Sequence, residues 1–267
     1  MKRLPALIIA LSLVAAGCAQ QKISLKYDYA PGLDTRYLWT IDSTTALSSS
    51  TDQSTTHLFM EVDVHEEVQR AAGRGGNSRL TITLTPRSLQ EGGVRAATPP
   101  PTKIEYQLGS NGQIRRPVTT ALSEREASAL ELGTILAQSR LALPNRPVGV
   151  GDRWSTPLRL SGDTGTIDFK GQGRLVGFDL RSGRRLARIE TDRSGEITAQ
   201  EQLAGVFVEL RGRSTNTATS MLDLDRGILY SSVSRFASNF DLADEQSGRL
   251  AGTLRVTLVS KLQLQPG

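Results

Sequence analysis

The sequence is poor in cysteine, histidine and aromatic residues. One cysteine in 267 residues excludes an intrachain disulfide, so stability must come from the core and from hydrogen bonding between strands. Two histidines leave few candidate metal ligands. Aromatic residues make up 5% of the chain and hydrophobic residues 38%. This composition is lean, but it suffices for a sheet protein that exposes one face to water.

The chain also lacks the short motifs of common hydrolases. It contains no G-x-S-x-G and no H-E-x-x-H. His57 and His65 are eight residues apart, about 26 Å along a strand, which is too far to bind one metal ion. The glycines of residues 171–177 are spaced G-x-G-x-x-x-G and precede no predicted helix, unlike a dinucleotide-binding loop. We therefore expect no enzymatic activity, no cofactor and no metal.

The charge balance does not indicate a nucleic-acid-binding protein. The 32 basic and 27 acidic residues give a net charge of +5. Loss of Lys2 and Arg3 with a signal peptide would leave 30 basic and 27 acidic residues, a net charge of +3. The 26 arginines and 6 lysines are interspersed with acids rather than clustered, so no basic patch is predicted.

The N-terminal residues have the pattern of a lipoprotein signal peptide. Lys2 and Arg3 precede an apolar run over 4–14, and the small residues Ala15-Ala16-Gly17 stand directly before Cys18, the one cysteine. This arrangement predicts cleavage between Gly17 and Cys18 and acylation of Cys18, with palmitate among the attached chains. The alternatives are an ordinary secreted protein or a single membrane span, but the apolar run is shorter than the roughly 20 residues a span needs.

Two or more acyl chains hold a protein stably on a membrane, so Cys18 is expected to anchor the mature chain. Ala19 follows the cysteine, where an aspartate would favour retention in the inner membrane. We therefore expect a location in the bacterial cell envelope, on the periplasmic face of the outer membrane if the host has two membranes. Residues 18–24 are the predicted lipidated tether.

Beyond the tether the dominant hydrophobic period is two, which is typical of strands. Asn-Gly, Ser-Gly and Arg-Gly pairs separate many of the alternating runs, as in antiparallel hairpins. The Ser/Thr-rich piece over 43–56 is predicted to be the tip of a long hairpin. About ten to twelve strands are expected, and the clearest inward-facing sets are Leu25, Tyr27 and Tyr29; Tyr37, Trp39 and Ile41; Leu58, Met60, Val62 and Val64; Leu80, Ile82 and Leu84; and Leu254, Val256 and Leu258.

One segment, residues 123–141, has helical periodicity instead. Ser123 and Glu126 form a capping box, apolar residues follow at helical spacing, and Pro144 ends the pattern. The predicted fold is therefore mainly β: a large curved antiparallel sheet, half-barrel or sandwich-like, with one principal α-helix and an N-terminal signal helix. Residues 1–17 are the expected signal peptide and 25–267 a single β-rich domain, with two similar halves, 25–120 and 145–267, as a further hypothesis.

Four aromatic residues are candidates either for the core or for a ligand groove: Tyr27, Tyr37, Trp39 and Trp154. Large aromatic side chains usually fill cores, so packing is the favoured interpretation. A curved sheet lined by tryptophans also offers a surface to an acyl chain or a sugar. The sequence alone leaves both interpretations open.

The stretch "LPNRPVGVGDRWSTP" carries a family resemblance. It resembles the central segment of a family of uncharacterised bacterial exported proteins that share a P-V-x-V-G-D-x-W turn, preceded by an L-x-Y-x-x-x-x-G-x-x-x-R-Y pattern that appears here as "LKYDYAPGLDTRY". In this turn Gly151 and Asp152 reverse the chain and Trp154 re-enters the sheet. The resemblance implies an exported protein and brings no catalytic residues.

In architecture the chain resembles, more loosely, the periplasmic lipoprotein carriers LolA and LolB, in which a curved antiparallel sheet is closed by helices. That resemblance implies a hydrophobic ligand in the concavity. We expect a non-enzymatic interaction or scaffold module on the membrane, with a hydrophobic-ligand carrier slightly behind. The discriminating feature is whether the inward side chains fill the interior or line a cavity.

Overall fold

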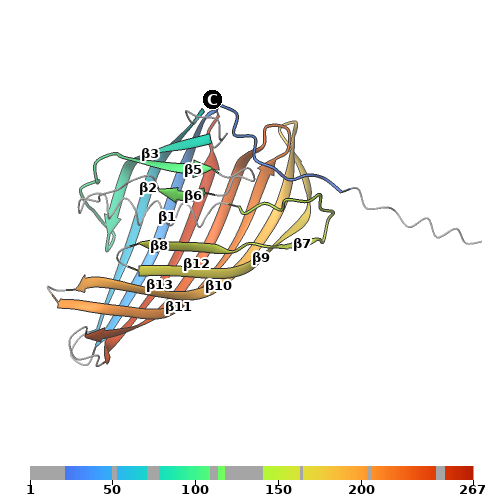
Figure 1. Ribbon diagram of the computed structural model, residues 1–267. Coiled ribbons are helices and arrows are strands. Elements are labelled where there is room, and N and C mark those ends of the chain that lie inside the picture. Colours follow the sequence, from blue (N-terminus) through green and yellow to red (C-terminus); the bar gives the residue numbers. More distant parts are fainter. Residues whose placement is uncertain are drawn as a thin grey trace, which may run out of the picture.

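The computed structural model describes residues 22–49, 53–70, 78–108, 114–117, 141–162, 165–203, 206–244 and 250–266. These residues form thirteen antiparallel strands of one sheet (Figure 1). The strands are β1 (Asp34–Ser49), β2 (Gln53–Arg70), β3 (Ser78–Glu91), β4 (Val94–Arg95), β5 (Thr102–Leu108), β6 (Ile114–Pro117), β7 (Arg153–Ser155), β8 (Leu158–Gly162), β9 (Gly165–Arg181), β10 (Arg184–Leu203), β11 (Val206–Asp223), β12 (Ile228–Asp244) and β13 (Leu250–Leu264).

Eleven strands lie in the order β6-β5-β3-β2-β1-β13-β12-β11-β10-β9-β7, while β4 pairs with β3 and β8 with β9. The described end strands β6 and β7 do not pair with each other, so the sheet is open. It curls so that its two ends, β5–β6 and β8–β9, both lie in front of the central strands (Figure 1). The prediction of a mainly β fold with a large curved antiparallel sheet is confirmed, as one continuous sheet.

Local sequence explains the long hairpins. Between β9 and β10, Ser182 has a φ of 50° and Gly183 a φ of 75°. Two consecutive residues with positive φ make a turn whose twist matches that of the flanking strands. The hairpin predicted over 43–56 is also present, because β1 and β2 pair from Asp34↔Glu67 to Ser48↔Gln53. Threonines and β-branched residues favour this extended backbone.

Most of the core lies on one face of the sheet, which we call the inner face. Residues on this face alternate with exposed residues along each strand, as the two-residue period predicts. The first and last long strands of the described chain are neighbours in the sheet, because β1 pairs with β2 on one side and with β13 on the other. Buried side chains of this face include Trp39, Ile41, Val62, Val64, Leu80, Ile82, Leu84, Leu175, Ile189, Leu222 and Leu262.

The segment before β1 differs from the sequence prediction. Leu25 and Tyr27 are buried, as their alternation suggested, but residues 24–30 form no strand. Two backbone contacts hold this segment. Ile23, just before it, forms an isolated bridge with Val148, and the Asp28 N–H donates to the Gly227 carbonyl at 2.8 Å. The apolar alternation of this segment therefore predicted the burial of Leu25 and Tyr27 correctly, but its prediction of a strand was wrong.

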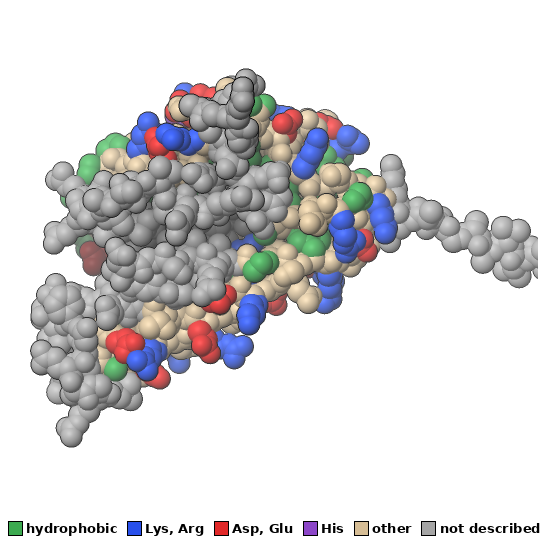
Figure 2. All heavy atoms as spheres, viewed as in Figure 1, with side chains coloured by type: hydrophobic (Ala, Val, Ile, Leu, Met, Phe, Trp, Pro, Cys, Tyr) green, Lys and Arg blue, Asp and Glu red, His purple; other side chains and the backbone are tan. Residues whose placement is uncertain are grey.

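The signal peptide, Cys18 and residues 123–140 of the predicted helix lie outside the described residues. Leu141, the last residue of that helix prediction, is buried in a non-helical segment. Within the described ranges, no helix has the length and hydropathy needed to cross a membrane. Basic and acidic side chains alternate over the visible described surface (Figure 2), in agreement with the interspersed charge pattern.

Candidate functional site

The inner face carries a band of polar side chains across β10–β13. Cross-strand register places Arg193 opposite Asn216, and Ser234 opposite Ser260. These side chains are buried in a position that elsewhere on the sheet holds Leu, Ile or Trp. We call the set the inner polar patch; it consists of Thr191, Arg193, Ser214, Asn216, Ser220, Ser232, Ser234, Ser238 and Ser260.

Several hydroxyl groups of the patch bond across the strands. The Oγ atoms of Ser220 and Ser232 lie 2.9 Å apart, and Ser238 donates to Ser214 at 2.7 Å. The indole Nε1 of Trp39 donates to Ser260 Oγ at 2.7 Å. These contacts offset the desolvation of the groups that make them.

Asn216 and Ser234 are different. Both side chains are fully buried, and within the described part of the chain neither the Nδ2 and Oδ1 of Asn216 nor the Oγ of Ser234 has a hydrogen-bond partner. Because Asn216 pairs with Phe236 and Ala218 with Ser234, the two are diagonal neighbours, about 7–8 Å apart across β11 and β12. A buried polar group left unpaired costs about 1–3 kcal/mol, so this pair is a local source of instability.

Arg193 brings a buried positive charge to the same patch. Its side chain is 3% exposed, and burial lowers the pKa of Arg193 to about 10, while Tyr27 raises it in part. The Nε of Arg193 donates to Thr156 Oγ1 at 3.4 Å. Glycine at position 171 makes room for it, because a Cβ there would lie 2.6 Å from Arg193 Cγ. The fold thus accommodates the stem of an arginine within the concavity.

Partly exposed apolar side chains continue the inner face beyond the patch. Leu47 lies opposite Leu254, and Leu254 opposite Phe240, on three adjacent strands. We call Leu47, Phe240, Leu254 and Val256 the inner apolar strip; all four are partly exposed. Leu258 shares the cross-strand row of Asn216 and Arg193, four residues from Leu254, so the strip extends about 13 Å from that row.

The four aromatic candidates lie together in the core at the other end of the inner face. Trp39 is fully buried, and Trp154 is 9% exposed. The indole Nε1 of Trp154 donates to the Ala142 carbonyl at 2.7 Å, and the hydroxyl of Tyr27 accepts from the Leu141 N–H at 3.3 Å. Tyr37, on β1, is 3% exposed.

The structural turn at Gly151 and Asp152 has the geometry expected from the sequence. Gly151 has a φ of 90°, in the left-handed region, and its N–H donates to the Leu175 carbonyl at 2.7 Å. Asp152 Oδ2 accepts from the Gly149 N–H at 3.0 Å. This turn directs β7 along β9, so that Trp154 pairs with Gly173.

The residues predicted from the sequence to face inward thus divide into two groups. Tyr27, Tyr37, Trp39 and Met60 are buried, whereas Leu58, Leu254 and Val256 are half-buried. One end of the inner face is filled, and the other retains accessible apolar surface. Arg193, Asn216 and Ser234 were not predicted from the sequence, although Ser214, Asn216 and Ser220 share the two-residue phase of Leu210 and Leu222.

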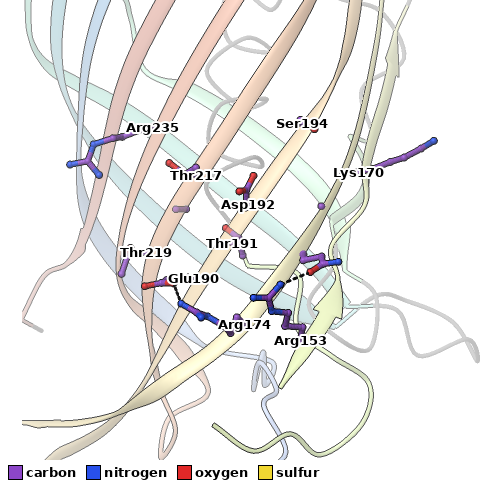
Figure 3. Close-up of a pocket in the computed structure, with 13 residues that line it drawn as sticks. Arg153, Lys170, Arg174, Glu190, Thr191, Asp192, Ser194, Thr217, Thr219 and Arg235 are labelled. Carbon is purple, nitrogen blue, oxygen red and sulfur yellow. Dashed lines mark hydrogen bonds and ion pairs between the residues drawn. The ribbon is translucent and has the colours of Figure 1, made fainter. Parts of the chain in front are cut away.

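The opposite face of the sheet holds an outer groove of about 510 Å³ over β7 and β9–β12 (Figure 3). Arg174 donates to Glu190 Oε2 at 2.7 Å, and Arg153 donates to Gln172 Oε1 at 3.5 Å. The side chains that face it are Arg153, Lys170, Gln172, Arg174, Glu190, Asp192, Ser194, Thr217, Thr219 and Arg235.

The two histidines form separate surface contacts. His57 Nε2 lies 2.7 Å from Asp42 Oδ1, and His65 Nε2 lies 2.9 Å from Asp34 Oδ1. One ligand atom from each of Asp34, His65 and Glu67 falls within 4.8 Å of the others, a grouping that the sequence analysis did not identify. Because exposed ion pairs are common and contribute little, these contacts do not by themselves indicate a metal centre.

No protein-family model and no curated protein matches the sequence. Solved structures with similarity include DynF of Micromonospora chersina, with 9% identity and a TM-score of 0.27 over 92% of this chain and 86% of that chain. The COG4313 outer membrane channel of Pseudomonas putida has 10% identity and a TM-score of 0.27 over 88% of this chain and 96% of that chain.

An outer membrane lipoprotein-sorting protein domain of Vibrio parahaemolyticus has 8% identity and a TM-score of 0.15 over 86% of each chain. TM-scores below 0.5 carry no argument about function, so the functional inference depends on the geometry of this chain.

Proposed function

We propose that this protein is a non-enzymatic, lipid-anchored envelope protein that binds an amphipathic lipid on the inner face of its sheet. The supporting observation is the juxtaposition of an unpartnered buried polar pair, Asn216 and Ser234, with a partly exposed apolar strip. This arrangement favours the hydrophobic-ligand alternative over the interaction module that the sequence put first.

The chemistry of the two regions specifies the class of ligand. An acyl chain lying on Leu254, Val256 and Phe240 would remove apolar surface from water, at roughly 25 cal/mol per Å². A head group carrying an acceptor and a donor would satisfy the Nδ2 and Oδ1 of Asn216. The guanidinium of Arg193 favours a negative charge in that head group, because charge-assisted hydrogen bonds are the stronger ones. An anionic lipid combines these features.

The alternative use of the inner face, as a filled core, accounts for only one end of it. Trp39 and its neighbours pack there in the manner of a core. A core has no need of a buried arginine beside an unpaired asparagine, because apolar residues of similar volume would avoid the desolvation cost. The polar patch therefore supports a binding role in addition to packing.

Native mass spectrometry of the full-length protein, extracted from its own host membranes in a mild detergent, tests the proposal. We expect adducts in the mass range of membrane lipids that leave on collisional activation, unlike covalent acyl chains. Leu254→Gln should abolish the adducts. Leu180→Gln, the same change at a position next to the β9–β10 turn that is 74% exposed, should retain them. A bare mass for the wild type, or equal loss in both variants, would contradict the proposal.

A further inference from the structure

The outer groove lies on the face of the sheet opposite the lipid-binding face and has no role in the proposed function. Cross-strand register arranges its side chains in rows. One row contains Gln172, Asp192, Thr217 and Arg235, from β9 to β12. The next row contains Arg153, Arg174, Glu190 and Thr219, from β7 to β11. We propose that this groove binds an acidic oligosaccharide.

The charges in the groove follow a simple order. Glu190 and Asp192 lie on the central strand β10, and positive side chains lie on both sides of them (Figure 3). Lys170 on β9 and Arg235 on β12 are three strand spacings apart across the sheet, about 14 Å, and one row of the same face apart along the strands. The groove thus presents two cationic flanks with acceptors and hydroxyl groups between them.

Some side chains of the groove are paired with each other, and others are available to a ligand. Arg174 is paired with Glu190, and Arg153 with Gln172. Among the described residues, the side chains of Lys170, Asp192 and Arg235 have no hydrogen-bond or ion-pair partner. Their unpaired state is ordinary for exposed residues taken singly, but here all three face one groove of defined volume.

The central carboxylates decide the class of ligand. A uniform polyanion would meet repulsion from Glu190 and Asp192, whereas sugar hydroxyls can donate to both. Thr217 and Thr219 add hydroxyls that donate or accept. Acidic substituents of the sugar would then reach Lys170 on one flank and Arg235 on the other. A short saccharide chain bearing carboxylates satisfies both the central and the flanking groups.

Isothermal titration of full-length protein in nonionic detergent with trigalacturonate, and with uncharged galactotriose as a comparison, tests this proposal. We expect binding of trigalacturonate that weakens as salt is raised, and none of galactotriose. Arg235→Gln should weaken binding about tenfold, as expected for loss of one charge-assisted contact. Arg213→Gln makes the same charge change at an exposed position outside the groove and should leave the affinity unchanged.

The remaining outcomes overturn the proposal. Equal weakening by Arg213→Gln would mean attraction by overall charge. No binding of trigalacturonate by the wild type would exclude the ligand class. Arg235-dependent binding to vesicles containing phosphatidylglycerol, without trigalacturonate binding, would assign the groove to a membrane surface instead. Failure of this experiment leaves the lipid adducts of the inner face unaffected, so the two proposals fail separately.

Discussion

The indole Nε1 of Trp39 on β1 donates a 2.7 Å hydrogen bond to Ser260 Oγ on β13. Both side chains are buried, and 221 residues separate them in the sequence. The bond fastens the first long strand to the last one at the junction between the filled core and the inner polar patch.

Trp39→Phe should lower the free energy of unfolding by about 1–3 kcal/mol, because it removes a buried donor and part of a buried ring. Urea denaturation measures the change. Ser260→Ala should cost less in the Trp39→Phe background than in the wild type, since the shared bond is already lost. Strictly additive effects of the two substitutions would contradict an energetic coupling between them.

Trp154→Ala should destabilise the protein by about 3–5 kcal/mol and lower Tm by roughly 6–20 °C, as expected for truncation of a buried tryptophan. Differential scanning calorimetry gives the shift. Unchanged Tm together with loss of a bound ligand would instead assign the ring to a binding groove.

Gly173→Ala should destabilise the wild type, because the new Cβ would lie 2.6 Å from Trp154 Cε2. In the Trp154→Ala background the space above position 173 is vacated, so the same substitution should cost much less. The comparison by chemical denaturation isolates the contact between the indole and the glycine. An equal cost in both backgrounds would mean that the backbone of β9, rather than Trp154, excludes the methyl group.

The burial of Arg193 predicts that the free energy of unfolding depends on pH only under alkaline conditions. Burial lowers the pKa of Arg193 to about 10 on folding, and below that value the side chain is protonated in both the folded and the unfolded chain. Its burial penalty is therefore constant near neutrality and shrinks as the pH rises above about 10, where the folded chain loses the proton first. Relative to Arg193→Met, the wild type should gain stability only there, as measured by urea titrations from pH 7 to 11. A difference that already changes between pH 7 and 9 would contradict this assignment.

Lipid anchoring remains a prediction from the sequence. Metabolic labelling with a palmitate analogue should mark the wild type and leave Cys18→Ala unlabelled, and membrane fractionation should release the variant. Equal labelling of both proteins would remove Cys18 as the acylation site.

Much of the sheet was predictable because one of its faces is buried. The alternation of Met60, Val62 and Val64 with charged residues specified both the strand and its inward side, and β2 has that orientation. Pairing was not predictable in the same way. Nothing local to Trp39 indicates that its neighbour is Leu262, because the β1–β13 register is set by the whole sheet.

The inner polar patch could not be predicted from the sequence, and the reason is physical. In β11, Asn216 is flanked by threonines, so both faces of the strand are polar and the alternation carries no contrast. Its burial follows from the neighbouring strands rather than from its own sequence. Leu25 and Tyr27 show the reverse case, since their apolar contrast was clear but the segment lacks a strand partner along most of its length.

The β1–β13 ladder has a consequence for how the protein is assembled. Thirteen residue pairs, from Tyr37↔Leu264 to Ser49↔Gly252, join strands at opposite ends of the described chain. The middle of the sheet therefore cannot close until the last strand is available, and such high contact order slows folding. During that delay the inner faces and edges of β1 and β12 are exposed, and unpaired edges of this kind are prone to mispairing and aggregation. Loss of β13 would divide the sheet at its centre rather than trim its edge.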